Sequence, residues 1–303
     1  MPPSDTFFTT PPNWSWLVIL YFFLGGIAGG SYFIAALLDL FGDVGDRPLA
    51  RLGYYVAFPL VLICAVLLIG DLTRPEAFWH MLLQSQRLPL PIFKYWSPMS
   101  IGSWALLIFG AFTFTSFFGS LTEEDRLRWR PAVRLNEIVR RGRLGGLFAL
   151  VGSAFGFFLA SYTGVLATVT NRPIWADNSV LGLLFLTSAA STAAALLLLL
   201  AHRRRAVLPE SLHWLSQLDN WSMILELIAL IALVVTLGPV AQSLLNVWGL
   251  LLLGVALIGI VIPLALHWRP RLVGSVNVPL ATVLVLAGGF LLRTVIVLAS
   301  EMS

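Results

Sequence analysis

Long runs of apolar residues recur along this chain, separated by short segments rich in arginine, proline and polar side chains. An apolar helix needs about 20 residues to cross the hydrocarbon layer of a membrane. Eight runs reach this length, at about residues 16–41, 51–71, 98–120, 144–169, 179–201, 219–238, 243–267 and 277–300. The pattern predicts an all-α integral membrane protein with eight transmembrane helices, in which residues 1–303 form a single membrane domain.

Composition supports the same class of protein. Hydrophobic residues make up 58% of the chain and charged residues only 11%, which is more apolar than an ordinary soluble domain. The one cysteine, Cys64, lies inside an apolar run. A chain with one cysteine forms no internal disulfide and cannot supply the four thiolates of an iron–sulfur cluster. Any metal redox centre must therefore come from a partner.

The basic residues indicate how the helices are oriented. Fourteen of them fall in the connections after the first, third, fifth and seventh runs, and four fall in the opposite connections. Cytoplasmic loops of membrane proteins carry the excess of lysine and arginine. We therefore expect both termini on the extracytoplasmic side, and the cytoplasmic membrane of a bacterium as the location.

The longest outer connection spans residues 72–97. Three prolines, Pro75, Pro89 and Pro91, lie around an apolar stretch at residues 77–83. Proline at the start and an apolar stretch after it are typical of a short helix that lies at the membrane interface. This outer segment is a candidate docking surface.

Ionisable side chains inside apolar spans are costly, so each one is a candidate functional residue. Asp39 and Glu226 lie toward the inner face and are candidates for a proton route. Asp71 and Arg293 lie toward the outer face. For each residue a structural interpretation stays open: a hydrogen bond between helices for Asp39 and Glu226, a turn with Arg74 for Asp71, and charge neutralisation or partner contact for Arg293.

Glycine and histidine give two further indications. The first span contains two overlapping G-x-x-x-G pairs at residues 25–30, which fit either close helix packing or space for a flat ligand. The four histidines, His80, His202, His213 and His267, lie in loops or at a helix end. A membrane cytochrome needs imidazole ligands inside the bundle, so we expect no haem.

Five segments in order along the chain resemble the NrfD/PsrC family, the membrane subunits of polysulfide-reductase-type complexes. They are residues 21–30, 71–80, 97–104, 161–164 with 171–175, and 288–293. The resemblance covers essentially the whole chain. It implies two four-helix bundles, a menaquinone or ubiquinone site near the outer face, and no haem. It also implies an extracytoplasmic iron–sulfur partner, joined to a molybdopterin or multihaem catalytic subunit.

The resemblance also suggests site residues. Its quinone pocket uses a histidine of the first helix and a tyrosine of the fourth, which correspond to Tyr21 and Tyr162 here. Tyrosine donates a hydrogen bond but is not a base near neutral pH, so Asp71 or His80 is the better proton acceptor. We therefore expect Asp71 and His80 to be catalytic and Tyr21, Tyr162 and Arg74 to bind quinone.

Two other functions remain open from the sequence. A secondary transporter is one, although Pro59, Pro239 and Pro263 do not interrupt corresponding helices of two halves. A structural membrane anchor without quinone chemistry is the other. Under the quinone hypothesis, with possible proton translocation, enzymatic activity belongs to the whole complex because this chain holds no electron carrier beyond quinone.

Overall fold

The computed structural model describes residues 14–84, 92–127, 130, 133–134, 136, 142–170, 172, 174–176, 178–202, 204, 206–268 and 277–301. Eight helical segments in these ranges are long and apolar enough to cross a membrane, which confirms the predicted all-helical membrane class. Six of these spans are formed by α1 (Trp16–Phe41), α2 (Arg47–Asp71), α3 (Pro98–Glu123), α6 (Val180–His202), α7 (Pro209–Thr236) and α10 (Asn277–Glu301).

The remaining two spans have distinct features. Helix α5 (Gly142–Thr168) follows the arginine-rich inner connection. The seventh span is built from α8 (Val247–Gly254), a π-helical turn η6 (Val255–Val261) and α9 (Ile262–Trp268). Within that turn Gly259 lies so close to Gly288 of α10 that a side chain on either would meet the other backbone. The wider π-turn therefore occurs where two helix backbones meet.

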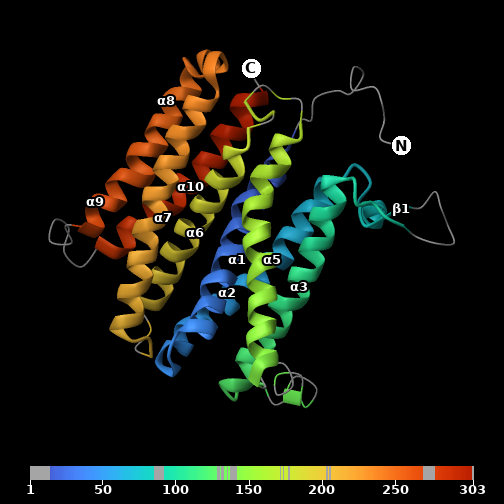
Figure 1. The fold of residues 1–303 in the computed structure, drawn as a ribbon, viewed down its shortest axis with the longest axis vertical. Helices are drawn as coiled ribbons and strands as arrows, with labels where there is room; N and C mark the ends of the chain where they lie inside the picture. Colours follow the sequence, from blue (N-terminus) through green and yellow to red (C-terminus); the bar gives the residue numbers. More distant parts are fainter. Residues whose placement is uncertain are drawn as a thin grey trace.

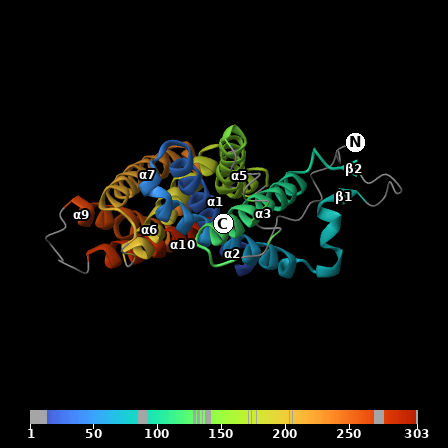
Figure 2. The ribbon, with the colours of Figure 1, turned by 90° about the horizontal axis from the view of Figure 1, so that it is seen from below.

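Helix α1 lies at the centre of the molecule. It packs against α2, α5, α6 and α10, with α2, α3 and α5 on one side and α6, α7 and α10 on the other (Figures 1 and 2). A side chain at Gly29 would strike the carbonyl oxygen of Gly156 in α5, and one at Gly30 would strike Ala189 in α6. The glycine run thus serves close helix packing on both sides, as expected for small residues at a membrane helix interface.

The ends of the helical part lie together. Figure 1 shows that α1, in blue, begins at the same end of the molecule where α10, in red, finishes. At the opposite end, η2 (Val44–Asp46) joins α1 to α2, and Asp46 accepts a hydrogen bond from Ser211 at the start of α7. Helix α7 begins at Pro209, ahead of the apolar span expected from residue 219.

The outer connection is folded against the ends of two helices. It contains a 3-10 helix, η3 (Pro75–Met81), and two short antiparallel strands, β1 (Leu83–Gln84) and β2 (Ile92–Phe93). Pro75 occupies the first position of η3, where its missing N–H leaves no donor unsatisfied. A second 3-10 helix, η5 (Gly238–Leu244), joins α7 to α8.

Candidate functional site

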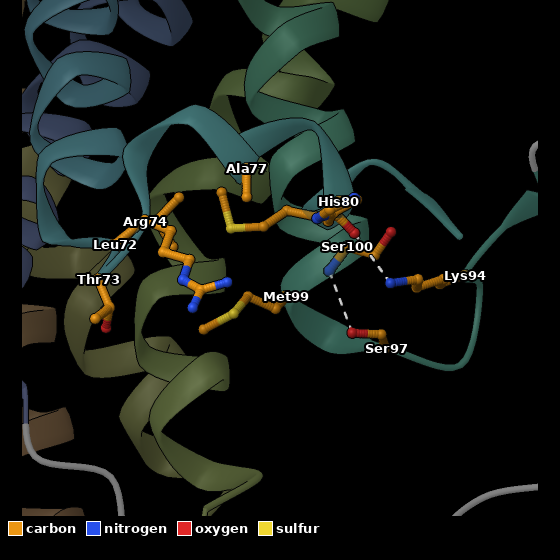
Figure 3. Close-up of a pocket in the computed structure, with 10 residues that line it drawn as sticks. Leu72, Thr73, Arg74, Ala77, His80, Lys94, Ser97, Met99 and Ser100 are labelled. Atoms are coloured by element: carbon orange, nitrogen blue, oxygen red, sulfur yellow. Dashed lines mark hydrogen bonds between the residues drawn. The ribbon is translucent and has the colours of Figure 1, made fainter. Parts of the chain in front are cut away.

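A cavity of about 480 Å³ lies between the end of α2, the η3 helix and the first turn of α3. Figure 3 shows the side chains that surround it. Its lining residues come from the chain just after α2, from η3, from the segment before α3 and from the first turn of α3. They are Leu72, Thr73, Arg74, Ala77, His80, Met81, Lys94, Ser97, Met99 and Ser100. Six of these ten residues have polar or charged side chains and four are apolar, so a ligand in the cavity would meet both kinds of surface.

The roof of this cavity is fixed by two hydrogen bonds to backbone. The Lys94 ammonium donates to the carbonyl oxygen of His80 at 3.0 Å. The indole N–H of Trp104, in α3, donates to the carbonyl oxygen of Leu82 at 2.9 Å. The first bond ties η3 to the segment just before α3, and the second ties the chain just after η3 to α3 itself.

The first turn of α3 forms one wall. Ser97 caps the helix by accepting from the backbone N–H of Ser100, and Pro98 stands at the first helical position. Ser100 is only 1% exposed, and its hydroxyl has no hydrogen-bond partner in the described part of the protein. A buried hydroxyl that lines a cavity without a partner is suited to bind a polar atom of a ligand.

Three predicted site residues lie at or beside the cavity. Arg74 and His80 line it and are exposed, and Figure 3 shows the Arg74 guanidinium directed toward Met99. Asp71 is the last residue of α2, directly before the lining residue Leu72, and it accepts a hydrogen bond from Ser15 at the start of α1. Asp71 therefore lies at the margin, where it is exposed to solvent.

The two predicted tyrosines lie behind the α3 wall. Tyr162 of α5 is 5% exposed, and its hydroxyl donates to the carbonyl oxygen of Pro98 at 2.5 Å. Its ring occupies the space that a side chain at Gly102 would need. Tyr21 of α1 is buried beside Cys64 and is close enough to Tyr162 for their side chains to interact electrostatically. The structure thus places Tyr162 against the first turn of α3 and brings Tyr21 near Tyr162.

An apolar groove of about 580 Å³ adjoins the cavity, and Met81 lines both. The groove runs between α2 and α3 on the surface of the helices. Its walls include apolar side chains of both helices: Phe58, Leu62, Ala65, Ile69, Leu107 and Phe114. The cavity and the groove therefore adjoin at Met81, and the apolar walls of the groove suit a hydrocarbon chain.

The two acids that the sequence grouped toward the inner face have different partners. Asp39 is exposed, and its carboxylate accepts from the Tyr54 hydroxyl at 2.7 Å, between α1 and α2. Glu226 is 4% exposed in α7, where it interacts with Ser188 of α6 and Arg293 of α10. No interaction among the described residues joins Asp39 to Glu226.

Arg293 is fully buried among α1, α6 and α10. Its guanidinium donates to the Ser188 hydroxyl at 3.0 Å, and to the carbonyl oxygens of Gly289 at 2.8 Å and Phe22 at 3.2 Å. Its exposed fraction is 0%, so it offers no surface to a partner protein. These contacts favour the structural interpretation, in which the guanidinium satisfies buried carbonyls and an acid.

Sequence reasoning did not single out three residues that the structure makes prominent. Ser100 and Lys94 line or close the outer cavity, and Asp219 is a fully buried acid in α7. Ser100 lies within the segment 97–104 that carried the family resemblance, which is a signal that could have identified it. Within the described ranges no group of three or more histidine, cysteine, aspartate or glutamate side chains could hold a metal ion.

These features define a multi-pass membrane protein with a ligand-sized cavity at one end of its helices. The family described as "Polysulphide reductase, NrfD" matches residues 6–303, so the chain belongs to the NrfD family of membrane proteins. The resemblance seen in the five sequence segments is thereby confirmed.

Named relatives agree with this membership. A polysulfide reductase chain of Wolinella succinogenes is 26% identical over 319 aligned positions, covering 95% of this chain and 94% of that protein. Protein NrfD of Escherichia coli is 27% identical over 189 positions, covering 58% of this chain and 55% of that protein. A selenate reductase subunit of Mesobacillus selenatarsenatis is 24% identical over 98 positions, or 32% of this chain and 20% of that protein.

Proposed function

We propose that this chain is the quinone-handling membrane subunit of a respiratory or photosynthetic redox complex. The observation that carries the proposal is the cavity beneath η3, which adjoins the apolar groove between α2 and α3 at Met81. A quinone has a flat head with two carbonyl oxygens and, in membranes, a long hydrocarbon tail. The cavity and the groove fit these two parts.

Residues of this chain have separate roles in that site. Ser100 donates a hydrogen bond to the head group from the α3 wall, and Arg74 supplies a positive charge at the opposite edge. Tyr162 holds the first turn of α3 in place from behind through the Pro98 carbonyl, and Tyr21 lies near Tyr162. Met99 and Leu72 provide apolar contact with the ring.

Asp71 and His80 are the proton acceptors in this proposal. Quinol oxidation releases two protons and two electrons, and a carboxylate or imidazole at the margin can pass protons to solvent. His80 lines the cavity and Asp71 stands beside Leu72 at its margin. The electrons leave through a docked partner because this chain holds no metal cofactor of its own in the proposal.

The helix arrangement and the partner subunits are inferred from family membership, and the orientation in the membrane is inferred from the distribution of basic residues. We propose that the helices form two four-helix bundles in a bacterial cytoplasmic membrane, with both termini and the cavity on the extracytoplasmic side. An iron–sulfur subunit then docks over η3, and a molybdopterin or multihaem catalytic subunit binds beyond it. Two relatives are named as one chain of a polysulfide reductase and one subunit of a selenate reductase, which supports an assembly of several subunits.

Filling the groove tests the proposal. Ala65 is half-buried in the α2–α3 groove, and Ala65→Trp should block the hydrocarbon tail and reduce quinone-dependent turnover of the complex by about tenfold or more. The matched control is Ala256→Trp, because Ala256 is also half-buried and lines a separate apolar groove between α7 and α8. The control should retain parental turnover.

Extraction of lipid-soluble material from the purified complex gives the second measurement. The parent and Ala256→Trp should each carry quinone, and Ala65→Trp should carry much less. Equal quinone content and equal turnover in all three proteins would contradict the proposed site. A parent complex with no quinone and no quinone-dependent turnover would favour the structural-anchor function instead.

A further inference from the structure

A second polar site lies away from the outer cavity, inside the group formed by α6, α7 and α10. These three helices pack together, with α6 against both of the others (Figure 1). Among the described aspartate, glutamate, lysine and arginine residues, three have side chains that are essentially inaccessible to solvent: Asp219 and Glu226 of α7 and Arg293 of α10. Two buried acids thus share the interior with one buried guanidinium.

Two serines on one face of α6, Ser188 and Ser191, lie beside these groups. Glu226 interacts with Ser188, which accepts a hydrogen bond from Arg293 at 3.0 Å. Asp219 lies seven residues before Glu226 on the same face of α7, about 10 Å away along the helix axis. Ser191, one turn from Ser188, lies beside Asp219, but its hydroxyl makes no hydrogen bond of normal geometry among the described residues, and Asp219 also interacts electrostatically with Glu226.

Asp219 differs from the other two groups because neither of its carboxyl oxygens makes a hydrogen bond of normal geometry within the described part of the protein. A buried ionised carboxylate needs a compensating positive charge. Arg293 compensates one acid, and Glu226 is the acid beside it. The second negative charge requires either a proton or another cation.

His267, at the end of α9, is the titratable side chain placed to supply that proton. Its Nδ1 atom hydrogen-bonds Oδ1 of Asn220 at 2.8 Å and lies 3.9 Å from Oδ2 of Asp219. The next residue, Trp268, is 66% exposed, so this end of α9 lies near the surface of the molecule. A small rotation of the imidazole moves its N–H from Asn220 to Asp219.

We propose that Asp219, Glu226 and Arg293 form a buried store for one exchangeable proton, loaded through His267. The imidazolium of His267 gives its Nδ1 proton to the Asp219 carboxylate, leaving a neutral imidazole and a neutral carboxylic acid. The imidazole regains a proton from water at the end of α9. Ser191 and Ser188 can each accept one proton and release another, so the stored proton moves between Asp219 and Glu226 without net change in the hydroxyls.

The store is independent of the proposed quinone site, which lies around the first turn of α3. It also separates the two acids that the sequence had grouped. Glu226 belongs to the store, whereas Asp39 pairs with Tyr54 between other helices. The proposed store needs both buried acids, Asp219 and Glu226, together with Arg293, because one guanidinium balances only one of the two carboxylates.

Infrared spectroscopy of the purified protein, in its native complex at neutral pH, tests the store. The parent should show the carbonyl band of a buried protonated carboxyl group. Asp219→Asn and Glu226→Gln should each abolish the band, because one remaining acid is then balanced by Arg293 as a carboxylate. Glu210→Gln is the matched control, since Glu210 is an exposed acid in the first turn of the same helix, and it should keep the band.

Hydrogen–deuterium exchange of the same band tests the entrance. His267→Gln should keep the band but slow its shift after transfer to heavy water by about tenfold or more. A parent protein without the band, or a band that survives in either amide variant, would overturn the store. Exchange in His267→Gln at the parental rate would overturn loading through His267, and none of these readouts depends on quinone turnover.

Discussion

At the scale of single residues, the buried hydroxyl groups differ in whether they donate a hydrogen bond within their own helix. Several buried serines and threonines in the described helices donate to a carbonyl three or four residues earlier, as Ser120 and Thr192 do. The hydroxyl of Ser100 has no partner among the described residues, although it lines the outer cavity. A hydroxyl of the first kind supports its helix, whereas one of the second kind is available to a ligand.

Ser100→Ala provides a test at this scale. The change removes no hydrogen bond seen in the described part of the protein, so thermal stability should be unchanged, while the KM for quinol should rise about three- to tenfold, as expected for a lost bond of ~1 kcal/mol. The matched control is Ser31→Ala, because the Ser31 hydroxyl is also buried and unpartnered in the described ranges but belongs to the middle of α1. A KM that moves equally in both variants would contradict the role given to Ser100.

Residue depth is where the sequence was least informative. Hydropathy begins the sixth span at residue 219, which puts Asp219 at the edge of that span and not among the candidate residues. The structure begins α7 at Pro209, so Asp219 lies well inside the helix and is 0% exposed. The early turns of α7 contain both polar and apolar side chains. Their mean hydropathy therefore does not show which face of the helix is buried.

At the scale of helices, glycine composition and spacing were informative because backbone contact needs small residues. The overlapping G-x-x-x-G pairs in α1 meet α5 and α6 directly. The π-turn at Gly259 was not predictable, because it depends on the approach of Gly288 from a helix that follows later in the chain. Local pattern predicts that helices exist, but their irregular turns follow from tertiary contacts.

Two alanine substitutions should therefore affect thermal stability differently. In Gly29→Ala the new methyl group meets the carbonyl oxygen of Gly156, which forces α1 and α5 apart and lowers the unfolding temperature in detergent by several degrees. In Gly254→Ala no described atom lies within 4 Å of the new methyl group, and a helical glycine is replaced by a better helix former. That variant should be as stable as the parent or slightly more stable, and a destabilised Gly254→Ala beside an unchanged Gly29→Ala would contradict this account.

At the scale of the whole molecule, α1 connects the two polar sites. One side of this helix carries Tyr21, which lies with Tyr162 behind the outer cavity. The adjacent residue, Phe22, accepts a hydrogen bond from Arg293 of the buried store through its carbonyl oxygen. Adjacent residues of one central helix thus lie near Tyr162 on one side and contact the buried store on the other.

The family resemblance predicted the class of protein, because the class depends on spans and short motifs, whereas the location of the quinone site stays a prediction. It could not predict that the first turn of α3 forms a wall. The partners of Asp71 and Tyr162 were likewise hidden, since Ser15 and Pro98 are distant in sequence. Contacts of this kind arise only when the eight spans pack.

The orientation in the membrane is the last prediction, and it decides on which side a redox partner docks. The start of α1 and the end of α10 lie at the same end of the molecule as β1 (Figure 1), which follows η3 and the cavity-lining residue Met81 in the chain. The connections at the other end carry fourteen of the nineteen basic residues. Because positively charged loops remain in the cytoplasm, a reporter fused after Ser303 should read as extracytoplasmic, and one inserted within residues 121–143 should read as cytoplasmic. A C-terminal fusion that reports from the cytoplasm, with the loop fusion outside, would place the cavity on the wrong side for an extracytoplasmic iron–sulfur partner and would exclude that part of the proposed assembly.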